Sequence, residues 1–437
     1  MKPKFLPIPA VILMTIAARS AEFRFDFGPG ETMEGCRQVT SASLYSKEAG
    51  FGFLPGPKVD DVAREFPNAL TSDACTSSSP FLFAVDVPEG NYEVRVVLGN
   101  PIGASDTTVR MGTRQLVLRN VAGGKGDFTR RSFTANVRTP EIPGGKGVGL
   151  KPRETDLARW ESRLTFEFSG SHPSVAGIDI RPAPEATTVF IAGDSTVTDQ
   201  GAEPWAGWGQ MLPAFFDNGT AVSNHAESGL ALFSFRSQRR LDKVLSMMKP
   251  GDHLLIQFGH NDQKDRRPGS GAFTTYKADL VSFVKAAREK KGFPVLVTPM
   301  ERRRWKGDEP QQTLSDYAEA VRQVATEEKV PLIDLHAMSL RFYRALGPEP
   351  SKRAFVHYPA GTWPDQKETL KDDTHHNAYG AYELARCVVE GIRGSVPALA
   401  ERLREDIPAF DPASPDDADG FRLPPSPSAA VLKPDGN

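Results

Sequence analysis

The chain has 437 residues, enough for two or three domains, and its content of 39% hydrophobic and 25% charged residues is typical of globular proteins. A formal net charge of −2 argues against a general nucleic-acid-binding protein, which usually carries a basic excess. Three cysteines are too few for a disulfide-based scaffold, and none of them has the spacing of a metal site.

Residues 1–20 are predicted to be a secretory signal peptide. Lys2 and Lys4 supply the positive charge, an apolar stretch runs over residues 11–18, and Ala-Arg-Ser at 18–20 has the pattern of a cleavage site. The alternative is a buried or membrane-anchoring segment, but the stretch is short for a transmembrane helix. We therefore expect a secreted or periplasmic protein with no stable membrane insertion after cleavage.

Residues 22–182 are predicted to form an all-β domain. Residues 82–87 and 92–96 carry partly or fully alternating apolar side chains, and the turn-forming residues 88–91 between them predict a hairpin. Further strands are expected over 164–168 and 178–180. Short strands separated by Gly and Pro are typical of a β-sandwich.

Two stretches of this domain resemble the galactose-binding-like jelly-roll modules: Phe-Arg-Phe-Asp-Phe-Gly at 23–28 and Phe-Leu-Phe-Ala-Val-Asp-Val-Pro-Glu-Gly-Asn-Tyr at 81–92. The resemblance implies a jelly-roll sandwich, and such modules often hold carbohydrate. The alternative is a spacer domain without a ligand of its own. Cys36 and Cys75 both fall here, so an exported chain could join them by a disulfide.

From residue 187 to about 405 the pattern changes, after a proline-containing linker at 181–186. Apolar strand runs now alternate with helices, which predicts a mostly parallel sheet in a three-layer α/β/α domain. The first strand is expected over 189–192, and the second ends near Asn224. Three more are expected over 254–258, 294–297 and 332–335. Residues 406–437 are rich in Pro, Asp and Ser, and we expect an irregular tail with little to bury.

Four helices are predicted from apolar residues spaced by three and four. The last one is expected to begin after Asn377, a good N-cap residue, and to bury Cys387 as a small hydrophobe. The apolar faces comprise Leu241, Val244, Leu245 and Met248; Tyr276, Leu280, Phe283, Val284 and Ala287; Leu314, Tyr317, Ala318, Val321 and Val324; and Ala385, Val388, Val389 and Ile392.

Polar residues follow the strands of this domain where each strand ends. Ser195 comes after the strand over 189–192, Gly229 after the second strand, and Asn261 after the third. Because the carboxyl ends of parallel strands share one edge of the sheet, one crevice can collect these residues. Asp372 and His375 lie just before the last helix as Asp-x-x-His, which places a carboxylate and an imidazole on one short loop.

These residue types fit acyl transfer to water. A serine needs a base to take its proton, and histidine titrates near working pH. Asp372 can orient His375, and the chain order Ser, Asp, His is one known for catalytic triads. The oxyanion donors would be the backbone N–H groups of Ser195 and Gly229 and the side-chain amide of Asn261.

The same blocks resemble those of the SGNH (GDSL-type) hydrolases. They are Gly-Asp-Ser-Thr at 193–196, Gly229, Gly-His-Asn-Asp at 259–262 and Asp-x-Thr-His at 372–375; stretches at 205–210, 251–262 and 298–303 resemble the rhamnogalacturonan acetylesterases. The resemblance implies a flavodoxin-like fold, no metal or other cofactor, and removal of O-acetyl groups from pectin-type polysaccharide. It implies Ser195 as nucleophile, His375 as base and Asp372 as its partner.

Two features depart from the family pattern. Relatives usually continue after the second block with Arg-Ser, whereas Leu-Ala-Leu-Phe follows Gly229 here. The arginine that the resemblance implies as a substrate contact is therefore missing, which leaves the exact polysaccharide open. Asp373 and His376 also form Asp-x-x-His. We favour Asp372 and His375 because the family has threonine before the histidine.

Three functions remain open from the sequence. The first is an acetylesterase acting on rhamnogalacturonan, with an acetylated polysaccharide or oligosaccharide as its expected partner and no nucleic acid. The second is an SGNH esterase for xylan or another acylated glycan, and the third is an inactive carbohydrate-binding protein. A lipase is disfavoured because no stretch marks a lipid-facing lid or a membrane-surface helix. The sequence leaves the oligomeric state undetermined.

Overall fold

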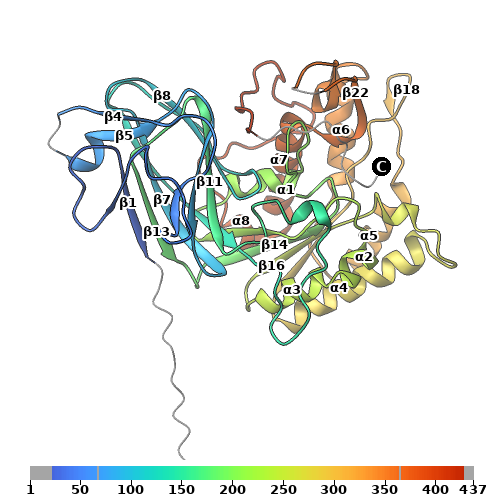
Figure 1. Ribbon diagram of the computed structural model, residues 1–437. Helices are drawn as coiled ribbons and strands as arrows, with labels where there is room; N and C mark the ends of the chain where they lie inside the picture. Colours follow the sequence, from blue (N-terminus) through green and yellow to red (C-terminus); the bar gives the residue numbers. More distant parts are fainter. Residues whose placement is uncertain (1–21, 66–67, 364–365, 428–437) are drawn as a thin grey trace, which may run out of the picture.

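The computed structural model describes residues 22–65, 68–363 and 366–427, so the predicted signal peptide lies outside the described residues. A β-rich domain lies beside a domain in which helices cover both faces of a sheet (Figure 1). In these ranges no helix combines the length and the apolar character that a membrane crossing requires.

The first domain is a sandwich of two five-stranded sheets with a smaller third sheet. The sheet orders are β10-β7-β13-β1-β2, β3-β6-β11-β8-β9 and β12-β5-β4. Phenylalanine rings fill the space between the large sheets; the centroids of Phe27 and Phe83 are 5.0 Å apart, edge to face. The strands are β1 (Phe23–Phe27), β2 (Arg37–Val39), β3 (Phe51–Phe53), β4 (Asp60–Ala63), β5 (Asp73–Thr76), β6 (Phe81–Asp86), β7 (Gly90–Gly99), β8 (Ser105–Met111), β9 (Gln115–Gly123), β10 (Phe128–Val137), β11 (Arg163–His172), β12 (Ser174–Val175) and β13 (Gly177–Pro182).

The hairpin predicted over 82–96 is wrong. β6 pairs with β3 and β11 in one sheet, whereas β7 pairs with β10 and β13 in the other. The turn between β6 and β7 therefore crosses from one sheet to the other. In a sandwich, strands of both sheets turn one face to the core, so alternation identifies a strand but not its neighbour.

All three cysteines are free. Cys75 and Cys387 are buried, and burial raises the pKa of both thiols. Cys36 is half-buried and has no disulfide with Cys75.

The second domain contains five parallel strands in the order β15-β14-β16-β17-β20. This is the flavodoxin-like order, in which the first strand lies between the second and the third. The strands are β14 (Thr187–Gly193), β15 (Thr220–Asn224), β16 (His253–Gln257), β17 (Phe293–Val297) and β20 (Leu332–Ile333); short hairpins form between β18 (Trp305–Lys306) and β19 (Glu309–Pro310) and between β21 (Phe355–Tyr358) and β22 (Leu370–His376).

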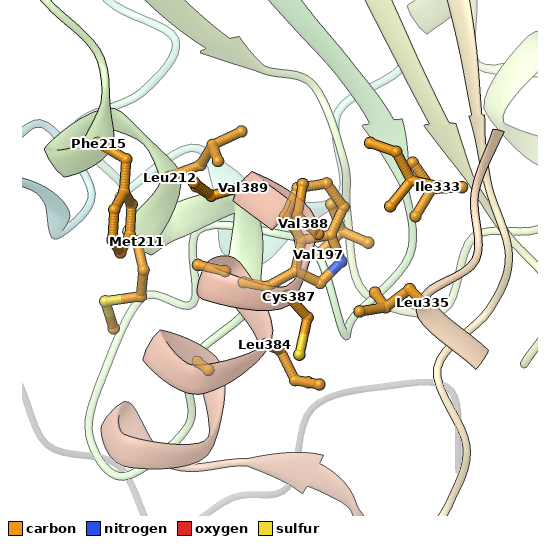
Figure 2. Packing of buried hydrophobic residues seen from close by; sticks show 14 of the residues in the cluster. Val197, Met211, Leu212, Phe215, Ile333, Leu335, Leu384, Cys387, Val388 and Val389 are labelled. Carbon is orange, nitrogen blue, oxygen red and sulfur yellow. The ribbon is translucent and has the colours of Figure 1, made fainter. Parts of the chain in front are cut away.

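Helices cover both faces of this sheet, as expected for a three-layer domain, although α6 was not predicted and begins at Leu335, inside the strand expected over 332–335. Val189 and Ile191 of β14 pack on one side with α1, α6 and α7, and Figure 2 shows this cluster around Cys387 and Val388. Phe190 packs on the opposite side with α2, α3, α4 and α5. The helices are α1 (Trp208–Met211), α2 (Leu232–Ser237), α3 (Arg240–Met247), α4 (Lys277–Glu289), α5 (Ser315–Glu327), α6 (Leu335–Leu346), α7 (Ala378–Ser395) and α8 (Pro397–Ala400).

The start of α7 is the one predicted from the sequence. Asn377 is its N-cap, and its side chain accepts a hydrogen bond of 3.1 Å from the backbone N–H of Gly380. Because α7 begins here, the strand β22, which contains Asp372 and His375, ends directly before the helix.

Two irregular segments join the domains. The described part of the tail, residues 406–427, has neither helix nor strand, and most of its residues are exposed or half-buried. Phe410 is buried, however, and the Ser426 hydroxyl donates to a Glu167 carboxylate oxygen of β11 at 2.6 Å. The second segment, residues 138–162 between β10 and β11, is called the arm below; it packs against the α/β domain.

Candidate active site

Ser195 lies in the turn directly after β14, the strand between β15 and β16. A Cβ on Gly193 would lie 2.7 Å from a methyl carbon of Val197 and 3.0 Å from the carbonyl oxygen of Gln257, so glycine lets the chain turn closely here. Ser195 is 2% exposed, and its carbonyl oxygen accepts a hydrogen bond of 2.7 Å from the Gln200 side chain. The turn thus holds the serine at the carboxyl edge of the sheet.

The structure places the other predicted oxyanion residues in the loops that follow the two strands flanking β14. Gly229 follows β15 and Asn261 follows β16, so with Ser195 they occupy three adjacent strand ends. The two flanking loops also contact each other, since the Asn261 side-chain amide donates to the carbonyl oxygen of Leu230 at 3.0 Å. An amide nitrogen carries two N–H donors, so a second remains for a ligand.

Gly229 sits in a tight turn whose shape requires glycine. The turn over residues 227–230, called the oxyanion turn below, is closed by a hydrogen bond of 3.3 Å from the Leu230 N–H to the Glu227 carbonyl. Gly229 has φ of +78°, in the left-handed region that favours glycine. Leu230, which stands where the family pattern has arginine, is buried, and its N–H closes this turn.

Asp372 and His375 form a buried pair. His375 Nδ1 and Asp372 Oδ2 are 2.7 Å apart, and the other carboxylate oxygen accepts from the backbone N–H groups of Thr374 and His375 at 2.9 and 3.1 Å. Burial alone would raise the pKa of Asp372, but the His375 ring and the two N–H groups outweigh it and hold the pKa below its ordinary value. Asp372 therefore stays ionised and can orient the imidazole.

A bulge in β22 produces this pairing and separates the two possible Asp-x-x-His registers. The partner of Phe355 is His376, whereas the partner of the next residue, Val356, is Asp372, so residues 373–375 are extra in the ladder. The bulge brings His375 back onto Asp372. The structure thus makes an Asp–His pair in the register that the sequence favoured.

The alternative pair, Asp373 and His376, does not meet. His376 is 1% exposed, its Nε2 lies 2.9 Å from the Tyr343 hydroxyl, and burial lowers its pKa to about 3. Asp373 instead accepts from His357 at 2.9 Å and from Arg303 at 3.0 Å. Both residues therefore have structural partners of their own.

Asp194 and His260 are buried next to the turn that carries Ser195. One oxygen of Asp194 accepts from the N–H and the hydroxyl of Thr196 at 3.0 and 2.8 Å, and the other lies 3.4 Å from His260 Nδ1. Burial alone would raise the pKa of Asp194, but His260 and Thr196 outweigh burial and hold the pKa below its ordinary value. His260 is thus a buried neighbour of the nucleophile loop.

Sequence reasoning missed the role of two tryptophans. The Trp205 indole N–H donates to Asp372 Oδ2 at 3.3 Å, and that of Trp208 donates to Gln257 at 2.7 Å. Trp205 thereby links the Asp–His pair to the segment that follows Ser195. The Trp-Ala-Gly-Trp-Gly-Gln stretch at 205–210 carries both side chains, but its resemblance to the family does not indicate which residues they contact. In the ranges described, no group of three or more His, Cys, Asp or Glu could hold a metal ion.

Asp262 gives a testable pH dependence of stability. One oxygen accepts from the Leu232 N–H at 2.9 Å, and burial, with a contribution from the Asp194 charge, raises its pKa to about 7. An unfolded aspartate has a pKa near 3.9. Between about pH 4 and 7 the folded state binds one proton more than the unfolded state. The contribution of Asp262 to the free energy of unfolding is therefore complete below about pH 4 and is lost as the pH rises through the folded pKa near 7.

We expect Asp262→Asn, which keeps the acceptor and cannot ionise, to show a Tm that rises relative to wild type from pH 5 to pH 8. Asp265→Asn is the control: Arg267 lowers the pKa of that carboxyl, which is ionised throughout this range, so no such trend is expected. Thermal unfolding of the three proteins across this range measures the effect. A Tm difference for Asp262→Asn that stays constant with pH would contradict the assignment.

Comparison with known proteins places both domains. A profile of the GDSL-like lipase/acylhydrolase family matches residues 191–382, and one described as beta-agarase/YXIM esterase-like, galactose-binding domain-like matches residues 23–126. The rhamnogalacturonan acetylesterase RhgT of Bacillus subtilis is 43% identical over 207 residues, 47% of this chain and 88% of that protein. The probable rhamnogalacturonan acetylesterase YesY of the same organism is 34% identical over 211 residues, 48% of this chain and 93% of that protein.

A third relative extends the similarity through both domains. The uncharacterised esterase YxiM of Bacillus subtilis is 30% identical over 389 residues, which is 86% of this chain and 92% of that protein. With the flavodoxin-like sheet and the buried Asp–His pair already described, these similarities lead to one assignment. The chain belongs to the GDSL-type (SGNH) hydrolases and is an esterase of that family with an N-terminal galactose-binding-like domain.

Proposed function

We propose that this esterase removes O-acetyl groups from a rhamnogalacturonan-type pectin through an acetyl-enzyme on Ser195. The observation that carries the reaction type is the buried 2.7 Å contact between Asp372 and His375, linked through Trp205 to the serine loop. The substrate class is supported by the 43% identity to RhgT and the 34% identity to YesY, whose names specify rhamnogalacturonan acetylesterases.

In the first half of the reaction, Ser195 Oγ attacks the acetyl carbonyl carbon while His375 Nε2 takes its proton. Asp372 accepts from the other ring N–H and stabilises the imidazolium that forms. The carbonyl oxygen becomes negative, and the N–H groups of Ser195 and Gly229 and the Asn261 amide donate to it. The C–O bond to the sugar then breaks, and the sugar oxygen takes the proton from His375.

In the second half, water attacks the acetyl group bound to Ser195 and gives its proton to His375. The same three donors stabilise the second tetrahedral intermediate. The bond to Ser195 Oγ breaks, the serine regains its proton from His375, and acetate leaves. One ester and one water thus become one sugar hydroxyl and one acetate.

Acetate release from acetylated rhamnogalacturonan and from acetylated xylan, measured side by side, tests the proposal. We expect release from the pectic substrate by the wild type and none by Ser195→Ala. Serine-dependent release mainly from xylan would keep the mechanism and contradict the substrate. Absence of release from either polysaccharide would contradict the proposed substrate and leave two alternatives, another acylated glycan or a carbohydrate-binding role.

We further propose that the protein acts outside the cytoplasm. The basic and apolar N-terminus over residues 1–20 supports export, as does a polysaccharide substrate that cannot enter a cell. N-terminal sequencing of the mature protein from culture supernatant and periplasm tests this; a chain that retains Met1 in the cytoplasm would contradict it.

A further inference from the structure

The oxyanion turn is contacted by two cationic side chains from the other domain. The carbonyl oxygen of Ser228 accepts hydrogen bonds from Lys151 Nζ and from the Arg153 guanidinium, the latter at 2.9 Å. Lys151 and Arg153 belong to the arm of the β-sandwich domain and lie more than 70 residues before the turn. The N-terminal domain therefore reaches a loop that carries a predicted oxyanion donor.

The carbonyl of Ser228 and the N–H of Gly229 belong to the same peptide unit. That unit is planar and trans, so its C=O and N–H point in opposite directions. Two cations that hold the oxygen therefore fix the direction of the Gly229 N–H. They also draw electron density toward the oxygen, which makes the N–H a stronger donor.

A second set of contacts holds the same turn. The buried carboxylate of Glu227 accepts from Arg153 Nε at 2.8 Å and also from Arg159 of the arm. Arg159 donates in addition to the Thr198 hydroxyl at 3.0 Å, in the segment after Ser195. The arm thus contacts both the turn of Gly229 and the loop of the nucleophile.

We propose that Lys151 and Arg153 are positioning residues that aim and polarise the Gly229 N–H toward the oxyanion, so that the β-sandwich domain completes the active site of the α/β domain. This inference rests on the proposed function, because it takes Gly229 as an oxyanion donor. It assigns the N-terminal domain a part in catalysis that is independent of any sugar binding.

The test compares Lys151→Gln/Arg153→Gln with a control at the same domain interface. The control is Arg239→Gln. Arg239 Nε donates to the carbonyl oxygen of Gly147 in the arm at 2.7 Å, so this variant also loses a hydrogen bond from a guanidinium to a carbonyl, but one away from the oxyanion turn. The substrate is 4-nitrophenyl acetate, whose small acetyl ester needs no sugar contacts. The measured quantities are kcat, KM and Tm.

We expect the double variant to lose about 10- to 100-fold in kcat with KM within about twofold of wild type, because oxyanion contacts strengthen in the transition state and loss of a whole donor costs about 10²- to 10³-fold. Arg239→Gln should keep kcat. The single variant Arg153→Gln, whose side chain is 37% exposed in the wild type, should fold and show part of the loss, and Arg153→Lys should recover most of it.

Two results would overturn the inference: a double variant with the kcat of Arg239→Gln, or one with raised KM and unchanged kcat, which would make these residues substrate contacts. Failure of the proposed function looks different. In that case the wild type itself would show no hydrolysis of 4-nitrophenyl acetate that depends on Ser195.

Discussion

Replacing Ser195 with alanine is expected to lower kcat for acetate release by a factor on the order of 10⁴ or more, as loss of the nucleophile does in serine hydrolases. The change removes one oxygen from a side chain that is already buried, so Tm should change little. The rate falls because no acetyl-enzyme can form, while the oxyanion donors and the Asp372–His375 pair remain in place.

Ser228→Ala is the matched control for this variant. Ser228 is a buried serine of the oxyanion turn whose hydroxyl lies 3.4 Å from the Gln200 side chain, and its backbone carbonyl is unaffected by the substitution. Its kcat should stay within a few-fold of wild type. Initial rates with acetylated rhamnogalacturonan decide the comparison; a Ser195→Ala enzyme that kept the wild-type rate would rule out the nucleophile.

The second large effect separates two adjacent histidines. His375→Ala should reduce kcat by about 10⁴-fold, since the serine loses its base, and should leave the fold intact. His376→Ala should have the opposite profile. It removes a ring whose centroid is 4.2 Å from that of Phe355 and leaves the Tyr343 hydroxyl without its 2.9 Å partner, so Tm should fall while kcat per folded molecule is largely kept.

Rates measured at a temperature where both variants are folded, with Tm recorded for each, distinguish these profiles. His376→Asn keeps a polar group toward Tyr343 and provides a milder second variant. Loss of activity in folded His376→Asn together with activity in His375→Ala would show that the base is His376, and that the register given by the β22 bulge is wrong.

Local patterns in the sequence were sufficient where one face of an element meets the core. Phe190 and Ile191 face opposite sides of the sheet, as expected for a strand buried on both faces, and Asn377 caps α7 as predicted. Patterns failed where pairing is decided by distant strands. β6 and β7 alternate like a hairpin, yet their partners are β11 and β10, which no local pattern reveals.

The candidate site could be predicted because its residues lie at strand ends and in short motifs. Ser195, Gly229 and Asn261 follow three strands that the flavodoxin-like order makes neighbours. The contacts around them could not be predicted, because they join segments far apart in the chain: Trp205 reaches Asp372, and Arg153 reaches Ser228 from the other domain. The second contact depends on how the two domains pack, and isolated polar residues carry no sequence signal for either contact.

Covalent labelling tests most directly the claim that Ser195 is the nucleophile and His375 its base. The wild type, Ser195→Ala and His375→Ala would be incubated with a serine-reactive fluorophosphonate and analysed by peptide mass spectrometry. We predict one adduct on the peptide containing Ser195, none in Ser195→Ala, and labelling slowed by several orders of magnitude in His375→Ala. An adduct on another residue, or labelling that persists in Ser195→Ala, would contradict it.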